Sequence, residues 1–377
     1  MTKLIKLITI NLLVFASIIG FLEVVLLYFL KSNHKELLID KKKIEKIAYE
    51  GLTEEYKLLN KKCNLPRILN LNGSAINFAK DFSCPKMSFK NGQRTTTGSN
   101  ESAAQKIHVF GGSTILGQGT IDRGTIPSKL QSLISDNKIT SVTNQGFGSL
   151  VLTQQFDKLK SITINKKDII VFYDGGNDAF NTYIYNNKDG NIIGYNRGNK
   201  FLLYSSIVKS FLSKNSSIYI YLSRIKNTPQ NEKLKCEFLP TYNQREIKKM
   251  TSYYLDKIKE INDYVESRQA YFYHFLQPIM EYKKEYLESD YYNVLLRMSN
   301  FQPCLMESLN SYYSILSSEY DNSNKEVNKF NLSKSLKNDE KNINFNYFID
   351  WIHINSKGNH VISGIINSKI KDKILSK

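Results

Sequence analysis

The longest apolar stretch of this 377-residue chain lies near its start. Residues 7–30 are almost uninterrupted hydrophobic residues, with Lys3 and Lys6 before them and Lys31 after them. As a helix, this stretch would rise about 36 Å, which is enough to cross a bilayer with some tilt. A signal peptide would show a shorter apolar region and a small-residue cleavage site, and neither is evident. The pattern predicts an uncleaved transmembrane anchor within residues 1–31.

The orientation of this anchor follows from the short tail before it, because lysines on both flanks leave the positive-inside rule undecided. A tail of only six residues favours a cytoplasmic N-terminus. We therefore expect the rest of the chain on the extracytoplasmic side of the membrane. Glu23 is costly inside such a helix, so we expect it near the outer interface or paired with a neighbouring helix.

The region that follows, residues 32–105, is charged and irregular. Its pattern predicts a helix over residues 35–59 and a loop over residues 90–102, which are rich in Gly, Ser, Thr and Asn. No motif with catalytic chemistry occurs there. We expect this region to act as a stalk or linker and to pack against the domain that follows.

From residue 106 to residue 377, short apolar runs alternate with helical patterns. The runs predict buried strands over residues 107–110, 141–144, 168–173 and 270–276. The patterns between them predict helices over residues 126–135, 150–162, 245–268, 291–318 and 358–375. This alternation is typical of a parallel α/β sheet. The Tyr- and Asn-rich residues at about 180–235 predict an insertion in this domain, and the polar residues 321–344 predict a loop.

The formal net charge of +17 predicts attraction to an anionic partner such as lipid headgroups or acidic glycans. No nucleic-acid-binding motif appears and the lysines are spread along the chain, so we expect no nucleic acid partner. A generally basic, solvated surface is the alternative explanation of the charge.

The four cysteines, Cys63, Cys84, Cys236 and Cys304, show no CxxC spacing. We therefore expect no zinc site, and no other metal or cofactor. In an exported chain these cysteines allow two disulfides, and proximity in sequence would pair Cys63 with Cys84 and Cys236 with Cys304. Four free thiols are the alternative.

Polar and glycine-rich motifs follow the first three predicted strands, and a fourth motif lies near the C-terminus. They are Gly111-Gly112-Ser113-Thr114, Asn144-Gln145-Gly146-Phe147-Gly148-Ser149, Asp174-Gly175-Gly176-Asn177-Asp178 and Asp350-Trp351-Ile352-His353. In open parallel sheets, ligands bind at the carboxyl ends of the strands. We therefore expect these four motifs to meet in one site.

The order and spacing of the motifs resemble those of the SGNH (GDSL-like) hydrolase family, in its membrane-anchored bacterial branch. The resemblance covers about residues 106–377 and implies a three-layer α/β/α fold with a central parallel sheet, as in flavodoxin-like proteins. It implies that Ser113 is the nucleophile, His353 its general base and Asp350 the carboxylate that orients the imidazole. Asn177 would donate its side-chain amide to the oxyanion hole, together with backbone N–H groups of Ser113 and the glycine block.

The chemistry of these residue types fits those roles. A serine hydroxyl is a poor nucleophile until a neighbouring base takes its proton. Histidine titrates near neutrality, so it can accept that proton and deliver it to a leaving alcohol. Of the five histidines, only His353 lies in a predicted loop with a carboxylate at fixed spacing. The other four lie beside the predicted membrane span, in predicted strands or on the last predicted helix.

Two positions depart from the family pattern. Gly112 stands where the family usually has Asp before the serine; glycine still forms the turn, but whatever the aspartate anchors is lost. Ser149 stands where the family has its oxyanion glycine, and Gly148 precedes it. Only a backbone N–H is needed, so either residue can serve, and we favour Gly148. Asp174 and Asp178 are expected to shape the turn around Asn177 rather than to act as acids.

Together these observations predict a single-pass, membrane-anchored serine esterase. It would cleave O-acyl esters, with O-acetyl groups of an envelope or secreted polysaccharide as the first choice of substrate and a lipid ester as the second. The same triad would serve an O-acetyltransferase if a sugar hydroxyl replaced water. A non-catalytic glycan-binding or assembly protein with this fold is the alternative of another class. The oligomeric state is not indicated by the sequence.

Overall fold

The computed structural model describes residues 49, 51–61, 68–71, 75–78, 81–134, 139–185, 244–281, 303–323, 326–336 and 347–375. Within these ranges, no helix is both long enough and apolar enough to cross a membrane. The anchor predicted over residues 1–31 and most of the insertion predicted at about 180–235 lie outside the described residues.

A five-stranded sheet forms the centre of the domain. Its order is β7 (Thr140–Asn144), β6 (Gln105–Gly111), β8 (Ile169–Asp174), β9 (Tyr271–Leu276) and β10 (Lys329–Asn331). Every neighbouring pair is parallel, which confirms the predicted α/β class. The edge strand β10 was expected to be part of a loop, because its three residues lie within a polar stretch and carry no strand pattern of their own.

The strand order determines where a ligand can bind. β6 comes first along the chain, and the next two strands, β7 and β8, lie on opposite sides of it. The direction in which strands are added therefore reverses between β6 and β8. In open α/β sheets, the crevice outside the carboxyl ends of the strands at such a reversal is the usual ligand site.

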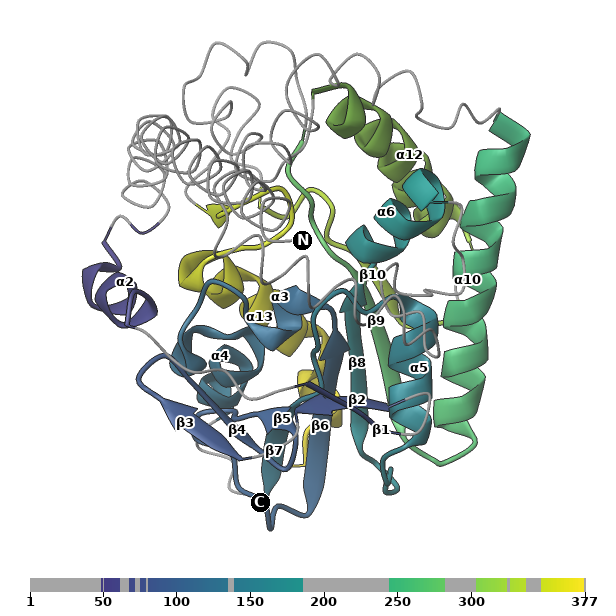
Figure 1. The fold of residues 1–377 in the computed structure, drawn as a ribbon. Coiled ribbons are helices and arrows are strands. Elements are labelled where there is room, and N and C mark those ends of the chain that lie inside the picture. Colours follow the sequence, from purple (N-terminus) through teal and green to yellow (C-terminus); the bar gives the residue numbers. More distant parts are fainter. Residues whose placement is uncertain are drawn as a thin grey trace, which may run out of the picture. The chain divides into compact units, whose positions relative to one another are not determined.

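Helices cover both faces of the sheet. α4 (Ile126–Leu133) packs on α13 (Ser356–Ile370) at one face, and α5 (Leu152–Lys160) packs on α10 (Gln244–Glu266) at the other (Figure 1). α6 (Gly176–Tyr185) packs on α12 (Pro303–Asn322). This arrangement confirms the predicted three layers.

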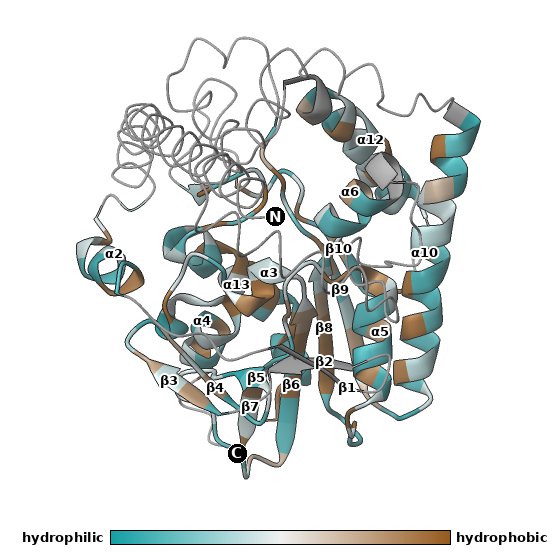
Figure 2. Cartoon of the chain, in the orientation of Figure 1, coloured by the Kyte–Doolittle hydropathy of each residue, from teal (hydrophilic) through white to brown (hydrophobic). Residues whose placement is uncertain are grey.

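The core consists of the strands and helix faces that the pattern of hydrophobic residues predicts to be buried. The central strand β8 is buried along its whole length, and Phe110 and Phe172 stack across β6 and β8 with ring centroids 4.9 Å apart. On α10, Ile258, Ile261 and Val265 are buried, a spacing that places them on one helix face. Figure 2 shows apolar strands in the middle and largely hydrophilic outer helix surfaces.

The region before the domain contains more structure than its sequence predicted. Besides the helix α2 (Thr53–Leu59), it has a hairpin, β1 (Ile68–Leu71) with β2 (Ala75–Phe78). A three-stranded antiparallel sheet follows, made of β3 (Phe82–Cys84), β4 (Met87–Lys90) and β5 (Gln93–Arg94). Strands of two to four residues are too short to leave a clear alternation of polar and apolar positions.

Cys84 takes part in a disulfide bond. The alternative of four free thiols is therefore wrong for this cysteine. The pairing of Cys63 with Cys84 stays a prediction.

A close backbone contact joins β7 to the segment after β6. Asn144, at the end of β7, donates its side-chain amide to the carbonyl of Ile115 (2.9 Å) and accepts from the N–H of Gly146 (2.9 Å). A Cβ atom on Gly146 would lie 2.2 Å from the backbone nitrogen of Leu116. Only glycine fits there, because backbone cannot give way as a flexible side chain can.

We expect Gly146→Ala to lower the free energy of unfolding by about 1–3 kcal/mol, because the added methyl meets backbone. Gly148→Ala is the matched control, since no atom lies within 4 Å of its Cβ position. Urea unfolding followed by circular dichroism measures both variants. Equal stabilities of the two would contradict the contact.

Candidate active site

Ser113 lies at the end of β6, at the reversal point of the sheet. It is the first residue of α3 (Ser113–Leu116), a single turn of helix (Figure 1). A Cβ atom on Gly111 would lie 2.6 Å from the carbonyl oxygen of Tyr173 at the end of β8. Glycine at this position therefore lets β6 approach β8 closely just before the chain turns into α3.

His353 lies against Ser113 from a distant part of the chain. Its Nε2 atom is 2.6 Å from Ser113 Oγ, and its Nδ1 atom is 2.5 Å from Asp350 Oδ2. With its proton on Nδ1, the imidazole donates to Asp350 and accepts the hydroxyl hydrogen of Ser113. The structure thus brings together Ser113, His353 and Asp350, the three residues predicted to form a triad.

The loop that carries His353 is held in place by its own backbone. Phe348 and Ile354 form an antiparallel bridge, and the N–H of Ile349 donates to the carbonyl of His353 (2.9 Å). Asp350 Oδ1 accepts from the backbone N–H groups of Ile352 (2.9 Å) and His353 (2.8 Å). One carboxylate oxygen therefore fixes the turn while the other orients the imidazole.

These contacts set the ionisation of Asp350. Burial acts to raise its pKa, but the hydrogen bonds and charge of His353 and the backbone N–H groups outweigh burial. The pKa of Asp350 is therefore lower than usual, and the carboxylate stays ionised beside the imidazole.

Asn177 lies next to Gly112, near the start of α6. Its side-chain nitrogen donates to the carbonyl oxygen of Leu150 (3.1 Å). That amide has two hydrogens, so the second can bind a developing oxyanion. A Cβ atom on Gly112 would lie 2.3 Å from this nitrogen. Glycine at this position therefore leaves room for the Asn177 amide in this chain.

The glycine block has an unusual conformation at Ser149. Its φ angle is +61°, in the left-handed region that a residue with a side chain rarely adopts. The backbone thus keeps a glycine-like conformation where the resembled family has glycine. Within the described residues, neither Gly148 nor Ser149 donates its N–H to a partner. Which of them serves an oxyanion stays a prediction.

A buried network lies behind the turn that presents Asn177. Asp174 Oδ1 accepts from the Tyr254 hydroxyl (2.5 Å) and contacts His274 Nε2 (3.1 Å). Asp178 Oδ1 accepts from the N–H of Leu152 (2.8 Å). Burial, and then the nearby Asp174 carboxylate, raise the pKa of Asp178 well above its usual range. Both carboxyl groups thus hold the turn around Asn177 in place.

The other described histidines are placed differently from His353. His108 and His274 are buried in β6 and β9, next to Asp168 and Asp174, and His360 is exposed on α13. In the described ranges, no cluster of three or more His, Cys, Asp or Glu residues is arranged to hold a metal ion.

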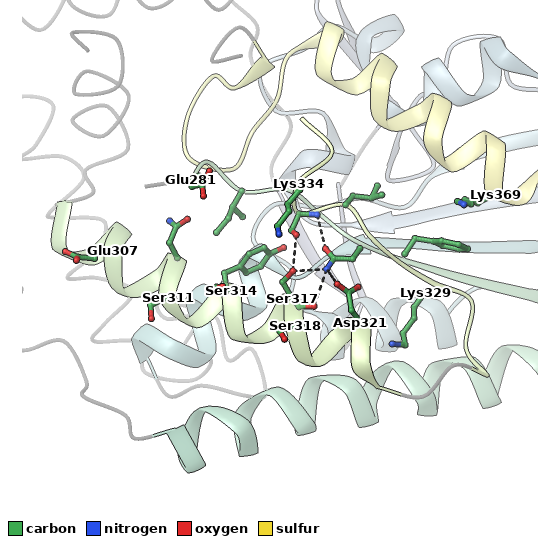
Figure 3. A pocket seen from close by; sticks show the side chains of 17 residues that line it. Glu281, Glu307, Ser311, Ser314, Ser317, Ser318, Asp321, Lys329, Lys334 and Lys369 are labelled. Carbon is green, nitrogen blue, oxygen red and sulfur yellow. Dashed lines mark hydrogen bonds between the residues drawn. The ribbon is translucent and has the colours of Figure 1, made fainter. Parts of the chain in front are cut away.

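A large open cavity of about 1180 Å³ lies between α12 and the edge strand β10 (Figure 3). Serine and asparagine side chains make up much of its wall, and Phe330 contributes an aromatic ring. None of the predicted site residues lines it. It is therefore separate from the group around Ser113.

No family model and no curated protein matches this sequence. Solved structures of similar fold include an acetyl xylan esterase, AlAXEase, at 12% identity and a TM-score of 0.39, covering 72% of this chain and 100% of that chain. The acetylxylan esterase Axe2 from Geobacillus stearothermophilus has 11% identity, a TM-score of 0.39, and coverage of 73% and 98%. A member of the lipolytic G-D-S-L family from Veillonella parvula has 10% identity, a TM-score of 0.34, and coverage of 71% and 97%.

The contact between Gly112 and Asn177 yields a test of the oxyanion hole. We expect Gly112→Ala to push the Asn177 amide away from the oxyanion position and so to lower kcat. The decrease should approach the factor of about 10²–10³ that follows removal of one oxyanion donor. Ester hydrolysis by the single variants and by the double variant Gly112→Ala/Asn177→Ala measures the coupling. The double variant should lose little beyond Asn177→Ala. If instead the fold-loss in kcat of the double variant equals the product of the two single losses, Gly112 acts independently of Asn177.

The lowered pKa of Asp350 yields a test in acid. The ionised Asp350 carboxylate stabilises the folded protein. This contribution is fully present above the ordinary pKa of about 3.9 and is lost as the pH falls through the lower pKa of the folded protein. We therefore expect Asp350→Asn to lose less stability than the wild type between about pH 5 and about pH 2. Urea midpoints at several pH values measure this, with Asp157→Asn, at a half-buried carboxylate paired with Lys160, as control. If the urea midpoints of the wild type and of Asp350→Asn fall equally with pH, this expectation is wrong.

Proposed function

We propose that this chain is a membrane-anchored serine ester hydrolase of SGNH type, which cleaves O-acyl esters of an envelope or secreted polysaccharide. One observation carries the catalytic part of the proposal: the hydrogen-bonded series from Ser113 Oγ through the imidazole of His353 to Asp350, with distances of 2.6 and 2.5 Å. This series supplies the base that a serine hydroxyl needs and the carboxylate that holds the base in the required tautomer.

The reaction proceeds in two steps. Ser113 Oγ attacks the acyl carbonyl carbon while His353 Nε2 takes the hydroxyl proton. The carbonyl oxygen becomes an oxyanion, which accepts a hydrogen bond from the free N–H of the Asn177 amide. When the intermediate collapses, His353 gives its proton to the leaving alkoxide and the acyl group stays on Ser113. Water then releases the acid by the same sequence, and Ser113 is restored.

Features around the triad support a glycan ester. Trp351 follows Asp350 directly, and Phe180 lies one helical turn after Asn177. Their rings are 5.6 Å apart and both are only partly buried, so they form an apolar rim beside the site. The carbon-bound hydrogens of a sugar ring can pack on such aromatic surfaces.

Three features support a place at the cell envelope. The apolar residues 7–30 are long enough to anchor the chain, and the net charge of +17 favours an anionic surface. Cys84 is disulfide-bonded, and such bonds persist in oxidising compartments outside the cytoplasm. We therefore propose that the catalytic domain faces away from the cytoplasm.

Hydrolysis of p-nitrophenyl acetate by the full chain and by Ser113→Ala tests the nucleophile. We expect Ser113→Ala to lower kcat by roughly 10⁴-fold or more, because no other group can form the acyl-enzyme. Ser132→Ala, at an exposed serine of α4, is the matched control and should keep wild-type activity. A fluorophosphonate should label the wild type and the control but not Ser113→Ala.

The same proteins distinguish the alternatives. Release of acetate from an O-acetylated polysaccharide, without comparable release of fatty acid from phospholipid vesicles, would support the glycan ester. Labelling by fluorophosphonate without hydrolysis, together with acetyl transfer to an added oligosaccharide, would show a transferase. Neither labelling nor turnover by a folded chain would overturn the enzymatic proposal in favour of a binding or assembly protein.

A further inference from the structure

A buried arginine from the region before the domain forms hydrogen bonds with the segment that carries Ser113. Arg94 ends β5, and only 2% of its surface is exposed. Its guanidinium donates to the carbonyl oxygens of Leu116 (2.8 Å), Gly117 (2.6 Å) and Thr120 (2.7 Å). These carbonyls belong to the end of α3 and to the loop after it, so Arg94 fixes the turn of helix that begins with Ser113.

The physical need for this contact follows from the length of α3. A single turn of helix forms few hydrogen bonds of its own and leaves its last carbonyls without helical partners. A cation that binds those carbonyls stabilises the helix end, and the planar fork of arginine can reach several of them at once. Asp122 Oδ1 accepts from Arg94 Nε (2.8 Å), and its other oxygen accepts from Ser88 (2.6 Å). The guanidinium is therefore held in one orientation.

A second buried group of the same region joins the two halves of the triad. Glu55, on α2, is only 7% exposed, and its Oε1 atom accepts from the Ser356 hydroxyl (2.6 Å) and from the N–H of Ile121 (3.4 Å). Ser356 begins α13, shortly after His353, whereas Ile121 lies in the loop that follows α3. One carboxyl group thus connects the nucleophile side to the histidine side.

Two further observations concern the same region and these two sides. The Tyr49 hydroxyl donates to the carbonyl of Gly119 (2.7 Å). A Cβ atom on Gly124 would lie 2.0 Å from Ser356 Oγ and 2.9 Å from Glu55 Oε1. Glycine at 124 therefore leaves the space in which Glu55 meets Ser356.

From these contacts we infer that Arg94 and Glu55 are positioning residues, which hold Ser113 Oγ at hydrogen-bonding distance from His353 Nε2. The region between the predicted anchor and the domain is then a required part of the catalytic apparatus rather than a spacer. This inference rests on the proposed function, because it concerns the geometry of the same triad.

The variants Arg94→Gln and Glu55→Ala, made in the full chain, test this role. We expect each to lower kcat for p-nitrophenyl acetate and the rate of fluorophosphonate labelling by about 10- to 100-fold, as displaced catalytic groups do, with KM nearly unchanged. Arg94→Lys should remain impaired, because an ammonium group cannot spread its donors over three carbonyls as a guanidinium does. If Arg94→Gln does not fold, Glu55→Ala decides the question.

The matched control is Asp168→Asn, at the opposite end of the sheet. Asp168 is fully buried and accepts from the backbone N–H groups of Lys106 (2.8 Å) and Asn165 (2.7 Å). Its loss should lower the melting temperature while kcat of the folded protein stays at the wild-type level. If Arg94→Gln and Glu55→Ala behave like this control, with lower stability and unchanged kcat, their role is structural only and the inference is overturned.

A substrate-free measurement separates this inference from the proposed function. If the wild type neither hydrolyses esters nor reacts with fluorophosphonate, the proposed function fails. The ring resonances of His353, followed by NMR at one pH and assigned with His353→Gln, still report on the contact with Ser113. We expect Arg94→Gln and Glu55→Ala to change the chemical shifts of these resonances and Asp168→Asn to leave them in place. Unchanged resonances in all three variants would overturn the inference.

Discussion

Close backbone packing at the carboxyl ends of three strands is the constraint on which the site depends. Gly111 lets β6 meet the carbonyl of Tyr173 on β8, and Gly146 lets the segment after β7 meet the backbone of Leu116. Gly112 leaves room for the amide of Asn177. A side chain at Gly111 or Gly146 would push backbone segments of the site apart, and one at Gly112 would displace the Asn177 amide. The short distances between the polar groups thus follow from the absence of Cβ atoms.

The site residues could be predicted from the sequence because each lies in a short motif whose place in the fold is known. Ser113 and Asn177 follow strands, and parallel strands bring their carboxyl ends to one edge of the sheet. Asp350 and His353 are close in sequence, so a single turn suffices to join them. The strand pattern therefore predicts the edge of the sheet at which Ser113 and Asn177 lie. The spacing of residues 350 and 353 predicts the Asp–His pair that completes the site.

Arg94 and Glu55 could not be found in this way. Each is a charged residue in a charged, irregular region, and nothing in the adjacent sequence distinguishes it from an exposed neighbour. Their burial depends on partners far away in the chain, such as Ser356 for Glu55. The sequence also leaves Gly148 and Ser149 as alternative oxyanion donors, because a left-handed φ angle at a serine leaves no mark in the sequence.

Two histidine–carboxylate pairs in the same fold show what distinguishes a base from a structural group. His274 and Asp174 lie on central strands and are fully or almost fully buried, and tyrosine hydroxyls contact Asp174 Oδ1 and both ring nitrogens of His274. His353 and Asp350 lie on a loop, where one imidazole nitrogen is committed to the carboxylate and the other faces Ser113. The same two residue types thus serve packing in one place and, in the proposed reaction, proton transfer in the other. What differs is the partner of the second imidazole nitrogen: in His274 it contacts the buried hydroxyl of Tyr320, whereas in His353 it contacts Ser113, the nucleophile of the proposed reaction.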